Sequence, residues 1–141
     1  MSTSTTADEA GAIGKSDGTA VSVSQEVSAP LGHVWEVLVS PQGSAALLGE
    51  GAVLGGKGEP YHCSDGTRGV VRSYHPLEQL RLSWHATEDA PPSLVEIDLT
   101  GQGATTLLEL RHEHLDGAGL ADAVLDRWTA GLEALAARAT A

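Results

Sequence analysis

TTLLELRHEHLDGAGLADAVLDRWTAGLEALAAR, residues 105–138, contains a strand pattern followed by a helix pattern. Residues 105–114 place apolar side chains at alternate positions, which is typical of a strand with one buried face. From Gly117 to about Arg138 the apolar spacing becomes that of a helix. Its apolar stripe contains Leu120, Val124, Trp128, Leu132 and Leu135, flanked by Ala121 and Leu125. We therefore expect a half-buried strand followed by a long helix that covers a sheet.

The rest of the chain supplies the other strands of that sheet. Residues 20–28 (AVSVSQEVS) alternate between apolar and polar, so we expect a half-buried strand there. Two short helices follow at 30–40 and 41–49, and the second ends at Gly49. Further strands are predicted at about 61–63, 68–74, 80–85 and 94–100, with turn residues between them. This order predicts an α+β fold with one antiparallel sheet of about six strands.

The composition argues against several classes of function. Eight Lys and Arg against nineteen Asp and Glu give a net charge of −11, which repels nucleic acid and anionic membrane surfaces. The sequence shows neither a long apolar run nor a signal peptide, so we expect a cytoplasmic location. The single cysteine, Cys63, excludes an internal disulfide. We expect residues 1–19 to be a disordered N-terminal tail and residues 20–141 to be a single domain.

Four motifs, taken in their order, resemble the SRPBCC (START-like, helix-grip) superfamily. They are SAPLGHVWEVL (28–38), DGTRGVVRSYHPLEQLRLSW (65–84), TTLLELRHEHL (105–115) and RWTAGLEALA (127–136). The sequence is most similar to the heat-shock protein 90 ATPase activator homologue family, over roughly residues 20–138. The resemblance implies a helix-grip fold, in which a curved antiparallel sheet wraps around the long C-terminal helix and a cavity between them takes an apolar ligand.

The chain departs from that family in two respects. The family often has Trp after its second helix, followed by glycine, whereas this chain reads Ala46-Leu47-Leu48-Gly49. The eukaryotic activators also carry a separate chaperone-binding domain, for which this chain is too short. The resemblance therefore implies the fold more securely than chaperone activation, because a fold does not specify a function.

His112 and His114 form a His-x-His pair, a spacing that a strand can use to bind a metal. The candidate third ligands are His62, Cys63 and Asp116. No His or Cys cluster has a recognised metal spacing, so we expect no metal and no cofactor. The alternative is that His112 extends the inward row of Leu108 and Leu110 and hydrogen-bonds a neighbour or a ligand.

Two other patterns suggest chemistry that their surroundings do not support. GAVLGGKG (51–58) nearly matches a phosphate-binding loop, but Gly58 stands where Ser or Thr is required. Cys63 is next to His62, and neighbours on a strand point to opposite faces, so we expect a structural cysteine. The sequence offers no hydrolytic triad and no convincing acid–base pair. We therefore lean against an enzyme.

All the tryptophans of the chain lie on the inner faces of their predicted elements, where they either fill the core or line a cavity. The predicted cavity residues are Trp35, Leu38, Val71, Trp84, Ile97, Leu110, His112, Trp128 and Leu132. Such a pocket suits a hydrophobic small molecule. The candidate polar contacts are Tyr61, Tyr74, His85 and His112, with His112 as the first choice.

The leading hypothesis is a non-catalytic, stress-related protein that binds an apolar small molecule between sheet and helix, as a monomer or homodimer. A second hypothesis, by resemblance to the chaperone activators, is a protein-interaction or chaperone-associated module with a protein partner. A third is a cyclase-like or hydrolase-like enzyme of the same superfamily, which requires acid and base groups inside the cavity.

Overall fold

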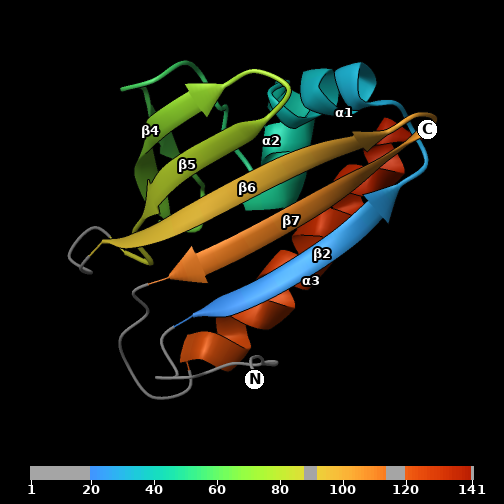
Figure 1. The fold of residues 1–141 in the computed structure, drawn as a ribbon. Coiled ribbons are helices and arrows are strands. Elements are labelled where there is room, and N and C mark those ends of the chain that lie inside the picture. The colour runs from blue at the N-terminus through green and yellow to red at the C-terminus, as the bar shows by residue number, and fades with distance from the viewer. Residues whose placement is uncertain (1–19, 88–91, 114–119, 141) are drawn as a thin grey trace, which may run out of the picture.

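The computed structural model describes residues 20–87, 92–113 and 120–140, and Figure 1 shows how their elements are arranged. In chain order these are β2 (Val21–Val27), α1 (Leu31–Leu38), α2 (Pro41–Leu48), β3 (Pro60–His62), β4 (Arg68–His75), β5 (Gln79–Trp84), β6 (Ser93–Gln102), β7 (Thr105–Glu113) and α3 (Leu120–Ala139). The strands form one six-stranded sheet in the order β2-β7-β6-β5-β4-β3, and all neighbours are antiparallel. The predicted α+β fold is confirmed. The predicted tail at residues 1–19 and His114 lie outside the described residues.

The edge strand β2 pairs with the last strand, β7, and α3 contacts β2. Val23 lies opposite Leu110 and Val21 lies opposite His112 in the β2–β7 register. The residues of β7 that face inward are buried, whereas Glu109 on the other face is exposed. The alternation in the sequence therefore has the expected cause, since one face of the sheet packs on the core and the other meets solvent.

Helix α3 runs across the inner face of the sheet and also packs against α2 (Figure 1). The described members of its predicted apolar stripe are fully or almost fully buried, namely Val124, Trp128, Leu132 and Leu135. Leu125, expected on the flank of the stripe, is 37% exposed. None of the described helices is long and apolar enough to cross a membrane.

The short helix α2 is fixed at both ends and by close contact with α3. At its start, the Ser40 Oγ accepts a hydrogen bond of 3.0 Å from the Gly43 N–H, and Pro41 occupies the first turn. At its end, Gly49 has a φ of 138°, which glycine adopts most readily. A Cβ atom added to Gly131 of α3 would lie 2.6 Å from the Leu47 carbonyl oxygen. This approach brings the C-terminal carbonyls of α2 next to α3.

Candidate functional site

The predicted cavity residues come together inside the protein, between the sheet and the helices. They come from α1 (Trp35, Leu38), β4 (Val71), β5 (Trp84), β6 (Ile97), β7 (Leu110, His112) and α3 (Trp128, Leu132). Each is at most 8% exposed. Apart from His112, which is fully buried, they belong to one hydrophobic cluster. That they line a ligand cavity stays a prediction.

The three tryptophans divide into two groups. The rings of Trp84 and Trp128 meet edge-to-face, with centroids 6.2 Å apart, and His112 lies against both at 5.0 and 5.8 Å. Trp35 instead packs against Tyr74, at 5.4 Å. The side chains of Trp84, Trp128 and His112 are thus the aromatic centre of the site.

A directed chain of hydrogen bonds runs through His112. The Trp128 indole Nε1–H donates to Nδ1 of His112 at 2.9 Å. The Nε2 of His112 lies 2.6 Å from the Ser93 Oγ, and that hydroxyl donates to the Trp84 carbonyl at 3.1 Å. An indole is a donor alone, so Nδ1 must be the acceptor and Nε2 must carry the proton. Both ring nitrogens of His112 are therefore occupied by protein groups.

The surroundings of His112 keep it neutral. Burial, with a smaller contribution from the positive charge of Arg127, lowers the pKa of His112 to about 4. Protonation would also put a second N–H against the indole N–H of Trp128, which has no acceptor to offer. At neutral pH the ring is an uncharged hydrogen-bond relay between α3 and β6.

Arg127, the neighbour of Trp128 on α3, ties three segments together. Its Nη2 donates to the Leu48 carbonyl at 2.5 Å and to the Thr67 Oγ1 at 3.2 Å. Its Nη1 lies 3.1 Å from an oxygen of Asp65. The pKa of Asp65 is lowered, first by the Thr67 backbone hydrogen bond and then also by Arg127. The guanidinium therefore joins the end of α2 and the turn before β4 to α3.

Two buried N–H groups beside this cluster have no hydrogen-bond partner among the described residues. They are Nε1 of Trp84 and Nε of Arg127. The Arg127 Cζ lies 5.7 Å from the centroid of the Trp84 ring and 5.9 Å from that of Trp128. The side chains that carry the two unpaired groups are therefore neighbours. Buried donors without partners are rare in proteins and call for a physical explanation.

The sequence did not single out Arg127 or Ser93 as functional. Arg127 precedes Trp128 at the edge of an otherwise apolar stripe. A cation in that position could have indicated a side chain that lies along the core and makes polar contacts at its end. Ser93 gave no signal, because it becomes a partner of His112 only through the β6–β7 pairing.

The remaining candidate residues lie around this centre. Cys63 is 8% exposed and donates to the Leu48 carbonyl at 3.4 Å, and burial raises the pKa of its thiol. Its neighbour His62 is exposed, as expected for adjacent strand positions. The hydroxyl of Tyr61 donates to the Ser83 carbonyl at 2.6 Å.

The glycine-rich loop and the metal hypothesis can also be placed. Residues 51–59 lead directly into β3, so no helix N-terminus follows the loop to receive a phosphate. Within residues 20–87, 92–113 and 120–140, no three His, Cys, Asp or Glu side chains gather as a metal site would require.

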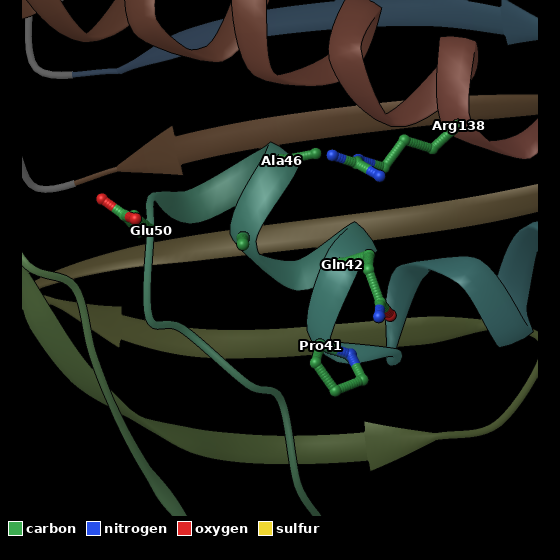
Figure 2. A pocket seen from close by; sticks show the side chains of 6 residues that line it. Pro41, Gln42, Ala46, Glu50 and Arg138 are labelled. Atoms are coloured by element: carbon green, nitrogen blue, oxygen red, sulfur yellow. The ribbon is translucent and has the colours of Figure 1, made fainter.

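Two open hollows lie away from the cluster. One, of about 410 Å³, is lined by Pro41, Gln42, Ala45, Ala46, Glu50 and Arg138, and Figure 2 shows Arg138 reaching from α3 toward α2. The other, of about 570 Å³, is lined by His75, Glu78, Gln79, Asp98, Leu99, Thr100 and Glu109. Neither hollow is lined by a predicted cavity residue.

Solved structures of other proteins share this architecture. CalU16 from Micromonospora echinospora superimposes with a TM-score of 0.69 at 25% identity, over 82% of this chain and 73% of CalU16. DynU16, a putative protein of the dynemicin biosynthetic locus, gives 0.72 at 25% identity over 84% of this chain. This chain spans 46% of DynU16. An HSP90 activator from Plasmodium falciparum gives 0.69 at 14% identity, over 79% of this chain and 89% of the activator.

The chain has the helix-grip fold of the SRPBCC superfamily. No protein-family model and no curated protein matches the sequence. The similarity of this helix-grip protein to other proteins is therefore seen by comparing structures. At the point where the family often has a tryptophan, this helix-grip chain buries Leu47 and Leu48, which are 2% and 1% exposed.

Proposed function

We propose that this protein is a non-catalytic binding protein that holds an apolar small molecule between the sheet and α3. The observation that carries the proposal is the convergence of buried aromatic and aliphatic side chains from six elements on one place, with Trp84, Trp128 and His112 at its centre. Sites for small molecules are lined mainly by such side chains, with a few polar groups that fix orientation.

Binding requires some of these side chains to separate, because they belong to one packed cluster. The affinity is then reduced by the fraction of molecules in the open arrangement. Arg127 is the natural restraint on opening, since it connects α3 to the end of α2 and to the turn that holds Asp65 and Thr67.

The groups around the cluster favour binding over catalysis. His112 uses both ring nitrogens within the protein and is neutral. Burial keeps the Cys63 thiol protonated by raising its pKa, so it is a poor nucleophile. General acid–base catalysis needs a group that can exchange a proton with the substrate. Neither of these two residues offers it.

The test uses the indole N–H signals of the three tryptophans as reporters. Isotope-labelled protein is titrated with N-phenyl-1-naphthylamine, a neutral apolar dye, and followed by two-dimensional ¹H–¹⁵N NMR. We expect saturable shifts of the Trp84 and Trp128 signals. Dye binding that leaves all three indole signals in place, or no saturable binding, would contradict the proposed site. Native mass spectrometry of protein purified from its own host then reports the mass of any natural ligand.

A second candidate function is a chaperone-associated role, supported by the likeness to the P. falciparum structure described as an HSP90 activator. This proposal places a protein partner on the outside of the fold and needs no ligand. Its test is the ATPase rate of the host's own HSP90 with and without this protein. A dose-dependent rise would favour the chaperone role, and an unchanged rate favours the binding protein.

A further inference from the structure

The polar end of the ligand can be placed from the two unpaired donors of the site. Nε1 of Trp84 and Nε of Arg127 are buried without an acceptor among the described residues. Trp84 is 4% exposed and its ring lies 5.7 Å from the Arg127 Cζ. A buried donor that lacks an acceptor loses its hydration without compensation. An acceptor supplied by a ligand would restore both hydrogen bonds.

The charge at this place favours an anionic acceptor over a neutral one. Arg127 carries a permanent positive charge, and its side chain is 28% exposed. Its carboxylate partner Asp65 is 50% exposed, so water screens that pairing. His112 adds no charge, because its pKa is lowered to about 4. Arg127 and Asp65 offset each other in net charge, but the unpaired Nε–H still belongs to a cationic guanidinium. It is therefore a charge-assisted donor, and such hydrogen bonds are stronger than neutral ones.

The other polar groups of the cluster already form hydrogen bonds within the protein. The Trp128 N–H donates to His112, and His112 in turn is bonded to Ser93. The Tyr61 hydroxyl donates to the Ser83 carbonyl. Trp84 and Arg127 are therefore the groups that a ligand can engage without breaking an existing hydrogen bond.

We propose that the ligand is an apolar molecule that carries an anionic group, such as a carboxylate, and that the oxygens of this group are received by Nε1 of Trp84 and Nε of Arg127. This inference rests on the proposed function and names the chemical class of the ligand. The net charge of the chain is −11, so the whole molecule repels anions. A preference for an anion must then arise locally.

The experiment compares two dyes with the same aromatic body. N-phenyl-1-naphthylamine is neutral, and 8-anilinonaphthalene-1-sulfonate adds one anionic group. Both dissociation constants are measured by the fluorescence of the dye. We expect the wild-type protein to bind the anionic dye at least about tenfold more tightly, from hydrogen bonds to charged groups.

Two variants locate the preference. Trp84→Phe removes the indole N–H and keeps an aromatic ring, and Arg127→Gln removes the charge. Each should lower the ratio of the anionic-dye affinity to the neutral-dye affinity about tenfold. The ratio is the readout because removing Arg127 also eases opening, which changes the affinity for both dyes alike. Arg138→Gln removes a charge from an exposed position of the same helix and is the matched control. Near-ultraviolet circular dichroism establishes that each variant is folded.

The outcomes separate the two proposals. Equal affinity of the wild-type protein for the two dyes overturns the anionic ligand and leaves the proposed binding function standing. A preference that Arg138→Gln abolishes as strongly as Arg127→Gln also overturns it, since the cause is then the general charge. If Arg127→Gln does not fold, Trp84→Phe alone decides, and an unchanged preference there contradicts the inference. Failure of both dyes to bind the wild-type protein counts against the proposed function itself.

Discussion

The indole N–H of Trp128 donates to Nδ1 of His112 over 2.9 Å, and this contact fixes the chemical state of the histidine. Because Nδ1 is an acceptor, the proton lies on Nε2, where the Ser93 hydroxyl is 2.6 Å away. The two residues come from α3 and β7, so the same contact attaches the helix to the sheet. His112 is thus a buried structural connection between the helix and the sheet.

The neutral state of His112 makes the stability of the protein depend on pH. Its pKa in the folded protein is about 4, against 6.5 as the ordinary value. Between these two pH values the unfolded chain binds more protons than the folded protein does. The contribution of His112 to the free energy of unfolding is therefore fully present above about pH 6.5 and is lost as the pH falls toward 4. We expect this group to contribute a loss of roughly 2–4 kcal/mol in the free energy of unfolding.

Urea unfolding at a series of pH values measures this loss, and His112→Gln is the control. The glutamine amide can accept from Trp128 and donate to Ser93 but does not titrate. Asp65, whose pKa is lowered, is present in both proteins and affects them equally. The difference in stability between the two proteins should shrink in the acidic range. Curves that stay parallel from about pH 7 to about pH 4 would show that His112 is not the titrating group.

Replacing Trp128 tests the connection from the helix side. Trp128→Ala should lower the free energy of unfolding by about 3–5 kcal/mol, because the side chain is fully buried. Trp128→Phe keeps most of the ring but leaves Nδ1 of His112 without its donor. We expect a smaller loss of about 1–3 kcal/mol and a rise in the pKa of His112, measured by ¹⁵N NMR of the imidazole.

The control for this series is Leu125→Ala on the same helix. Leu125 is 37% exposed, so its truncation should change the stability by no more than about 0.5 kcal/mol. An equal effect at Leu125 and Trp128 would contradict the assignment of Trp128 to the core. An unchanged His112 pKa in Trp128→Phe would contradict the hydrogen bond.

The space around two helical glycines predicts opposite effects of replacing them with alanine. A Cβ at position 131 would lie 2.6 Å from the Leu47 carbonyl oxygen, so Gly131→Ala should cost about 1–3 kcal/mol. A Cβ at Gly32 in α1 meets no atom within 4 Å, so Gly32→Ala should stabilise by up to about 1 kcal/mol. Thermal denaturation followed by circular dichroism measures both. If Gly131→Ala is as stable as the wild-type protein, the helices do not approach in this way.

The inner faces of β7 and α3 were predictable, because burial imposes a period on the sequence. The strand rule placed Leu108, Leu110 and His112 on one face, and the structure confirms that all three are buried. The same rule failed to orient Tyr74. A register shift between Val71 and Ser73 interrupts the alternation of β4, and Tyr74 then packs against Trp35.

The spacing of apolar residues was enough to predict which segments form strands and helices. It also predicted which side of each element is buried, except in β4 beyond the register shift between Val71 and Ser73. The partners of the polar groups within the core depend on how separate elements pack. Trp128 and His112 meet because α3 packs beneath β7, and Arg127 meets Leu48 because α2 lies close to α3. Hydrogen bonds depend on distance and direction between atoms of separate elements, and a periodic pattern carries neither quantity.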